Sequence, residues 1–205
     1  MKPLFIVVEG VDGSGKTTQI NLLLERFKKT NHPAMDTFEP TDGPVGSLLR
    51  NVLKRRIHAD QYTIAGLFLA DRLDHINNPV NGMKKYIDEG YTVICSRYYF
   101  STYAFQSEYI SPEWLVHCNS LCKEQFQPDL IIYLNVHPED SMTRIEEGRV
   151  ETELYETREK LQKAHLAYLD AFEKYGAGEN IHILDGSQSI ETISEEIWRL
   201  VQAIQ

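Results

Sequence analysis

The stretch FIVVEGVDGSGKTTQ, residues 5–19, begins with apolar and β-branched residues and continues into a glycine-rich segment. Residues 4–8 form a continuous apolar run, as a strand buried on both faces requires. Residues 10–17 match the pattern GxxxxGK[ST] at every fixed position, between that strand and a segment with helical spacing. This order of strand, glycine-rich loop and helix predicts a site for the phosphates of a nucleoside triphosphate.

The chemistry of the loop predicts a role for each of the residue types that the pattern fixes. The glycines let backbone N–H groups curl around phosphate oxygens, and the helix N-terminus adds partial positive charge. We expect Lys16 to reach the β- and γ-phosphates, and the Thr17 hydroxyl to ligate Mg²⁺ bound to the same phosphates. The residues expected to bind ATP are Gly10, Asp12, Gly13, Ser14, Gly15, Lys16, Thr17 and Thr18.

Four more segments have the character of strands. They are residues 92–95, 130–136 and 181–184, with a weaker candidate at 34–38. Segments with helical spacing separate them, and hairpin signals are few, which indicates a parallel sheet covered by helices on both sides. We therefore predict one α/β domain spanning residues 1–205, of the three-layer α/β/α P-loop NTPase type with a five-stranded parallel sheet.

The composition excludes several classes of protein. The longest purely apolar run, residues 4–8, is far shorter than the ~20 residues of a membrane span, and no signal-like leader precedes it. The three cysteines lack paired CxxC spacing, so neither a disulfide framework nor a zinc site is indicated. A net charge of −9 argues against a nucleic-acid-binding surface. We expect a cytoplasmic protein with neither membrane nor nucleic acid as a partner.

A phosphate-binding loop alone does not separate a kinase from a GTPase, a motor or a transporter ATPase. A GTPase would carry an Asn-Lys-x-Asp motif after a later strand, and the sequence contains none. Motor and transporter ATPases usually place an acidic residue at the end of a strand, whereas the strand at 92–95 leads into Ser96 and Arg97. The segments downstream of the loop must therefore distinguish between these classes of protein.

Those segments resemble the thymidylate kinase family over most of the chain. Residues 5–19 are very close to how that family begins, and LFLADR at 67–72 is similar to its LFxAxR helix. Residues 97–106 resemble its DRYxxSSxAYQ segment. Further similarities lie at Glu39-Pro40 with 43–50, at 128–134, and at 184–186, the loop beside the adenine. The resemblance implies transfer of the γ-phosphoryl group of ATP to dTMP, with Mg²⁺ as cofactor and a homodimer as the assembly.

The acceptor site follows from the same segments. Arg97, just past the carboxyl end of a strand, can hold a dianionic phosphate with its planar guanidinium. Phe68 and Arg72 lie four residues apart and share a helix face. By resemblance, Phe68 stacks on thymine and Arg72 donates to its exocyclic oxygen. The substrate-binding residues expected in full are Asp12, Glu39, Arg50, Phe68, Arg72, Arg97, Ser101, Thr102 and Gln106.

Residues 146–153 form a charged segment between two helical segments, which a mobile flap and a solvated loop explain equally well. By resemblance, residues 144–156 form a lid that delivers arginine to the transferring phosphate. Residues 11–14 of the phosphate loop hold no cation, so we expect the lid to supply one. Arg149 is preferred, with Arg144 and Arg158 as reserves. The catalytic residues expected are Lys16, Arg97, Arg149 and Arg144.

Two positions depart from the family pattern, and two alternatives stay open. Ser96 replaces the Asp of Asp-Arg-Tyr, and Phe38 replaces an Arg that many bacterial members carry, which leaves open how Mg²⁺ is held. A deoxynucleoside kinase would share the loop, the flap and Arg97, and would need a carboxylate base, for which Glu39 is a candidate. A non-catalytic nucleotide-binding regulator is the second alternative, although intact Lys16 and Arg97 argue against it.

One aromatic pair indicates packing. Tyr168 and Phe172 lie one helical turn apart, a spacing more typical of a core than of a ligand contact.

Overall fold

The computed structural model describes residues 1–148, 154–155 and 157–205. Its described part contains one five-stranded parallel sheet with the strand order β2-β3-β1-β4-β5. The strands are β1 (Phe5–Glu9), β2 (Ala34–Phe38), β3 (Thr92–Ser96), β4 (Leu130–Asn135) and β5 (Ile181–Asp185). The predicted α/β class and the five parallel strands are confirmed.

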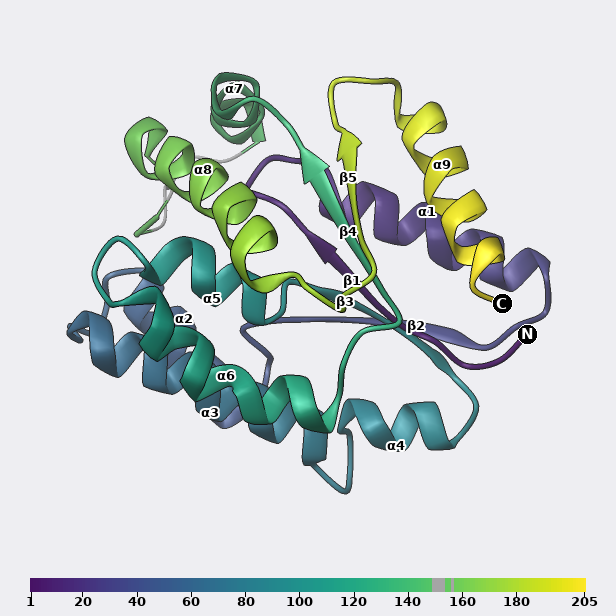
Figure 1. Ribbon diagram of the computed structural model, residues 1–205, viewed down its shortest axis with the longest axis horizontal. Coiled ribbons are helices and arrows are strands. Elements are labelled where there is room, and N and C mark those ends of the chain that lie inside the picture. Colours follow the sequence, from purple (N-terminus) through teal and green to yellow (C-terminus); the bar gives the residue numbers. More distant parts are fainter. Residues whose placement is uncertain (149–153, 156) are drawn as a thin grey trace.

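Helices connect the strands and cover the sheet (Figure 1). They are α1 (Lys16–Lys29), α2 (Pro44–Leu53), α3 (Gln61–Asn77), α4 (Met83–Asp88), α5 (Tyr99–Gln106), α6 (Pro112–Gln125), α7 (Pro138–Gly148), α8 (Arg158–Tyr175) and α9 (Ile190–Ala203). None of the described helices is both long enough and apolar enough to cross a lipid bilayer.

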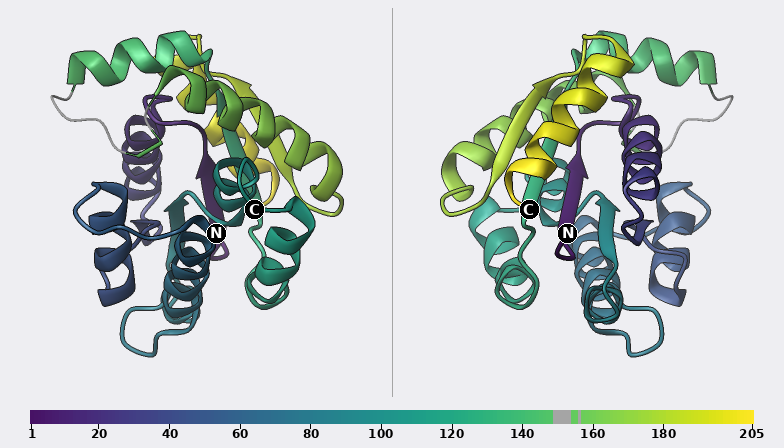
Figure 2. Two further views of the ribbon diagram at one scale, coloured as in Figure 1. Left: turned by 90° about the vertical axis from the view of Figure 1, so that its left-hand side faces the viewer. Right: turned by 90° about the vertical axis from the view of Figure 1, so that its right-hand side faces the viewer.

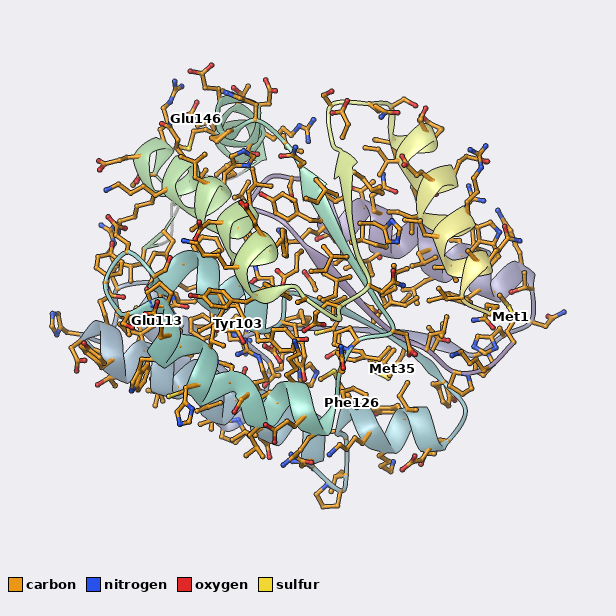
Figure 3. The ribbon with its side chains drawn as sticks, in the orientation of Figure 1. Met1, Met35, Tyr103, Glu113, Phe126 and Glu146 are labelled. Carbon is orange, nitrogen blue, oxygen red and sulfur yellow. The ribbon has the colours of Figure 1, made fainter. Side chains whose placement is uncertain are left out.

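The alternation of side chains along the central strands builds two cores. Ile6 and Val8 point toward α1 and α9, where they pack with Leu23 among other apolar residues. Phe5 and Val7 point to the opposite face, which is covered by the remaining helices. The side views in Figure 2 show the strands running through the centre of the molecule with helices around them. On the second face the rings of Phe5 and Phe126 stack with centroids 4.3 Å apart, and Phe126 lies where α6 ends (Figure 3).

Each predicted strand differs from the observed one by at most one residue at either end. The weakest candidate, residues 34–38, is the edge strand β2, and its side chains are half-buried or exposed. An edge strand has a neighbour on one side only, so its sequence needs fewer apolar residues than the strands at 92–96 and 130–135. The strand with the weakest apolar signal is thus an edge strand whose side chains are partly exposed.

The sheet brings three loops together at the carboxyl ends of its strands. The phosphate loop follows β1, Glu39 follows β2 and Arg97 follows β3, and β1 pairs with both β3 and β4. Ligands of open parallel sheets bind outside these carboxyl ends of the strands. The phosphate loop thus lies at the carboxyl end of the central strand, and Glu39 and Arg97 lie on one side of it.

The charged segment after β4 is more helical than we expected from the sequence. Helix α7 continues to Gly148, so residues 146–148 belong to a helix and not to a loop. Glu146 is exposed and points away from the body of the molecule (Figure 3). Arg149, the preferred lid arginine, lies outside the described residues. The lid over residues 144–156 stays a prediction.

Truncating a core aromatic side chain should measure how much the α1 layer stabilises the sheet. Phe27 of α1 is fully buried and packs edge-on against Trp198, with ring centroids 5.4 Å apart. We expect Phe27→Ala to lower the free energy of unfolding by about 3–5 kcal/mol, measured by urea denaturation. Leu166→Ala, at a side chain that is 58% exposed, should change it by less than about 0.5 kcal/mol. Equal effects of the two variants would contradict the assigned core.

Candidate active site

The phosphate loop contains three glycines with conformations that other residues rarely adopt. Gly10 has φ 151°, Gly13 has φ 76° and Gly15 has φ 94°. A Cβ atom on Gly10 would lie 2.5 Å from Ser14 Oγ, and one on Gly13 would collide with the carbonyl oxygen of Ser141 in α7. The missing side chains therefore let the loop fold tightly and pack beneath α7.

Lys16 lies folded against the loop that precedes it. Its ammonium donates to the carbonyl oxygens of Gly10, at 2.9 Å, and Val11, at 2.8 Å, and the residue is 8% exposed. It lines a hollow over the carboxyl ends of the central strands, which we call the loop hollow. The other residues of the loop in its lining are Asp12, Gly13, Gly15, Thr17 and Thr18.

Two hydroxyl groups of the loop bear on ligand binding. Ser14 Oγ is buried and has no hydrogen-bond partner among the described residues, whereas Thr17 is exposed in the loop hollow. The carboxylate-bearing residues Asp12 and Glu39 line the same hollow. Hydroxyl and carboxylate oxygens are the ligands that Mg²⁺ prefers, directly or through water. The residues present thus fit a hydrated Mg²⁺ bound at Thr17.

A second pocket opens beside the loop hollow. Apolar side chains form much of its wall, and we call it the apolar pocket; they are Pro40, Leu53, Phe68, Phe105 and Tyr155. Arg72, Ser101 and Gln106 add polar groups. Asp12, Glu39 and Arg97 line both the apolar pocket and the loop hollow. The two spaces therefore share one charged wall.

Arg97 is the cation of that shared wall. Its φ of 71° is left-handed, unusual for a residue other than glycine. One guanidinium nitrogen donates to Asp12, at 2.8 Å, and another donates to Ser101, at 3.3 Å, and Tyr168, at 3.2 Å. The guanidinium carbon lies 5.0 Å from the centre of the Phe105 ring. Burial by itself lowers the pKa of Arg97, but the Asp12 carboxylate raises it above its ordinary value, so the group stays charged.

Arg72 is locked in a buried ion pair. Its Nη2 lies 2.7 Å and its Nε 2.8 Å from Glu39 Oε2, and both side chains are 1% exposed. The second oxygen of Glu39 contacts His75 Nδ1 at 3.2 Å. Burial by itself lowers the pKa of Arg72, and the neighbouring Glu39 raises it above its usual range. Removing either partner would leave an uncompensated buried charge, which typically destabilises by about 3–5 kcal/mol.

Two of the expected substrate-binding residues lie behind the pocket wall. Thr102 Oγ1 accepts a hydrogen bond from Arg72 at 3.2 Å and does not line either space described above. Arg50 donates to the carbonyl oxygens of Pro40, at 2.8 Å, and Thr41, and pairs with Asp42 at 2.8 Å. Both residues therefore support groups that line the pocket.

Gln106 lies in the wall of the apolar pocket itself. Its amide nitrogen donates to the Tyr155 hydroxyl at 3.4 Å, while its Oε1 is buried without a partner among the described residues. The Tyr155 hydroxyl in turn donates to Gln61 at 2.9 Å. An unpaired buried acceptor is costly, so this amide oxygen is suited to a donor on a ligand.

Of the lid arginines, Arg144 lies at the loop hollow. From α7 it donates to the carbonyl oxygens of Gly13, at 3.4 Å, and Gly186, at 3.5 Å. It thus joins the phosphate loop to the loop after β5. Arg158 lines a different hollow, beside His137 and Glu139.

Two residues at the centre of the site, Glu9 and Tyr168, are not among the site residues expected from the sequence. Glu9 is fully buried at the end of β1, and burial raises its pKa above the ordinary value despite hydrogen bonds from Ser101 and the charge of Arg97. Tyr168 is fully buried in α8 and its hydroxyl contacts Arg97. An acidic residue closing an apolar strand is a signal that would have identified Glu9. No local pattern identifies Tyr168.

Comparison with known proteins agrees with the motifs. A family model described as thymidylate kinase matches residues 8–197. The chain is 35% identical to a protein of Pyrococcus horikoshii, with 98% of this chain and 97% of that protein covered. For proteins of Thermococcus onnurineus and Methanocaldococcus jannaschii the identities are 34% and 32%, with 97% and 95% of this chain and 97% and 93% of those proteins covered. All three carry the name "Probable thymidylate kinase". The chain belongs to the thymidylate kinase family.

Proposed function

We propose that this protein transfers the γ-phosphoryl group of ATP to dTMP, giving dTDP and ADP. The observation that carries the proposal is the wall shared by the loop hollow and the apolar pocket, in which Arg97 lies between the two spaces. A triphosphate on the phosphate loop and a monophosphate in the apolar pocket would face one another across this arginine. That arrangement suits transfer between two phosphate groups.

On the donor side, the loop N–H groups and Lys16 would bind the phosphates of ATP. The Lys16 ammonium contacts loop carbonyls in the structure, and the γ-phosphate offers it a partner of full negative charge. Thr17 would hold Mg²⁺, which neutralises charge on the β- and γ-phosphates when bound. The adenine would lie toward the loop at 184–186, to which Arg144 already connects the phosphate loop.

On the acceptor side, Arg97 and Ser101 would meet the phosphate of dTMP, and Asp12 its sugar. Phe68 in the apolar wall would stack on thymine, with Arg72 and Gln106 at the polar edge of the base. Thr102 would act through the guanidinium of Arg72. In the same way, Arg50 would act through the loop after β2, whose carbonyl groups it holds.

The geometry disfavours a deoxynucleoside kinase. Such an enzyme needs a carboxylate free to take a proton from an alcohol, and Glu39 was the candidate base. Both Glu39 oxygens are occupied, one by Arg72 and one by His75, and the residue is 4% exposed. A phosphate acceptor needs no such base, so a monophosphate substrate fits the site better.

Catalysis then rests on positioning and charge neutralisation, because phosphoryl transfer requires little covalent chemistry from the protein. Lys16 and Arg97 would meet the phosphates from the two sides. Arg144, and Arg149 from the lid, would supply positive charge over the transferring group. A homodimer stays a prediction drawn from the family resemblance, and a cytoplasmic location stays a prediction drawn from the sequence composition.

A test of acceptors decides between the proposed activity and its rivals. With ATP and Mg²⁺ present, ADP release should require dTMP and should not occur with thymidine. We expect kcat/KM for dUMP to be lower by roughly tenfold to a few hundredfold, since one buried methyl group in an apolar pocket contributes on the order of 1–3 kcal/mol. Turnover of thymidine alone would establish a nucleoside kinase, and no turnover with either would favour a regulator.

Replacing the loop lysine should separate chemistry from folding. We expect Lys16→Ala to retain its thermal stability within a few degrees and to lose nearly all turnover, because Lys16 acts on phosphate charge and its contacts are with the loop itself. The measurements are kcat with saturating ATP and dTMP, and the unfolding temperature. Turnover at the wild-type rate would refute the assignment.

Removing the α7 arginine tests the source of positive charge at the transferring phosphate. Arg144→Ala should lower kcat far more than it raises either KM, because the interaction strengthens in the transition state. Arginines that act this way raise the rate by about 10³–10⁵-fold. We expect the loss of kcat in Arg144→Ala to reach at most the lower end of this range, since Lys16 remains. Arg158→Ala, at a separate hollow, serves as the comparison and should leave kcat within about twofold. Similar losses in the two variants would contradict the assignment.

A further inference from the structure

We propose that Tyr168 is a positioning residue for Arg97. Through its hydroxyl, and together with Ser101 and the buried Glu9, it would hold the guanidinium in the orientation that binds the acceptor phosphate. The inference rests on the proposed function, because it assumes that Arg97 binds this phosphate. It assigns a catalytic consequence to a residue of α8.

The Tyr168 hydroxyl lies at the meeting point of three polar side chains. It is 2.7 Å from Ser101 Oγ, 2.9 Å from Glu9 Oε2 and 3.2 Å from Arg97 Nη1. Ser101 Oγ completes the cluster, at 2.7 Å from Glu9 Oε2 and 3.3 Å from Arg97 Nη1. Tyr168 and Glu9 are fully buried, so water does not replace these contacts.

The chemistry of these groups fixes the direction of the hydrogen bonds. A guanidinium can only donate, so both hydroxyl oxygens must turn a lone pair toward Arg97. Their hydrogens then point away from Arg97, toward Glu9 or toward one another. The other oxygen of Glu9 is held by the backbone N–H groups of Tyr98, at 2.8 Å, and Ser101, at 3.3 Å. The cluster is thus anchored to the main chain at the carboxylate and presents only acceptors to the arginine.

Two further contacts show that the ring of Tyr168 supports the same arginine. It meets the Phe105 ring edge-on, with centroids 6.0 Å apart and an interplanar angle of 86°. The guanidinium of Arg97 lies over that Phe105 ring. The Asp12 contact engages the Nη2 of Arg97, so Tyr168 and Ser101 determine where the other terminal nitrogen lies. Without the hydroxyl, rotation of the guanidinium about its bond to Asp12 is less restrained.

The chain offers a matched control in the same core. Tyr133 is also fully buried, and its ring centroid lies 4.9 Å from that of Tyr168. Its hydroxyl contacts His165 Nδ1 at 3.1 Å, and none of its described hydrogen bonds reaches Arg97. Tyr133→Phe and Tyr168→Phe therefore each remove one buried hydroxyl from one aromatic cluster. They differ in whether that hydroxyl touches Arg97.

The experiment compares steady-state kinetics of the wild type, Tyr168→Phe and Tyr133→Phe with Mg²⁺, ATP and dTMP. We expect Tyr168→Phe to lower kcat/KM for dTMP by roughly 10–100-fold, as for a lost hydrogen bond to a charged group, with the KM for ATP within about twofold. For Tyr133→Phe, both kcat/KM for dTMP and the KM for ATP should stay within about threefold of the wild-type values. Unchanged kcat/KM for dTMP in Tyr168→Phe, or equal losses in the two variants, would overturn the proposal.

A double-mutant cycle tests whether Tyr168 acts through Arg97. In the Arg97→Ala background, adding Tyr168→Phe should cause little further loss of kcat/KM for dTMP, whereas independent contributions would multiply. If Tyr168→Phe fails to fold, Glu9→Gln, which alters the carboxylate that accepts the hydrogen bond of the Tyr168 hydroxyl, takes its place in the cycle. A wild type inactive on dTMP, or an Arg97→Ala variant with wild-type activity, refutes the proposed function. An active wild type with a deficient Arg97→Ala and a normal Tyr168→Phe refutes only the positioning role.

Discussion

The site depends on keeping a largely buried cation, Arg97, charged between two pockets. An arginine taken out of water requires compensating partners, since desolvation of an ion is opposed only by good geometry and complete hydrogen bonding. Asp12 supplies the opposite charge, and Ser101 and Tyr168 supply acceptors. These partners come from the phosphate loop, α5 and α8. The three elements must therefore dock correctly before Arg97 has all of these partners.

The pairing of each buried arginine with a carboxylate also bears on how an acidic protein binds two anionic substrates. Its net charge is −9, yet the loop hollow and the apolar pocket together gather Lys16, Arg72, Arg97 and Arg144 in their walls. Arg72 is neutralised by Glu39, so its charge contributes little to attracting phosphate. Arg97 is paired with a more exposed partner, since the side chain of Asp12 is 33% exposed and that of Glu39 is 1% exposed. An anion can therefore compete for Arg97 more readily than for Arg72, whose geometry is fixed by the buried Glu39.

Local patterns in the sequence were sufficient for the sheet and the phosphate loop, because both follow from short-range periodicity and glycine spacing. They were insufficient where a role depends on distant partners. Glu39 and Arg72 are 33 residues apart, and Arg97 and Tyr168 are 71 apart. The spacing of Tyr168 and Phe172 correctly indicated packing, but periodicity cannot show that a packed ring carries a hydroxyl aimed at a cation. Likewise, the sequence pattern predicted that Thr102 and Arg50 bind the substrate, whereas in the structure they lie behind the pocket wall and hold residues that line it.

Ser96 shows how a departure from the family pattern fits the charges of the site. It lines the loop hollow, and its carbonyl oxygen accepts a hydrogen bond from the Glu39 N–H at 3.0 Å. Aspartate here would place a third carboxylate-bearing residue in a wall that already contains Asp12 and Glu39. It would compete with Asp12 for Arg97, and nearby like charges would oppose one another. Serine adds no third carboxylate to this hollow, so metal binding should depend on Asp12 and Thr17, which line it.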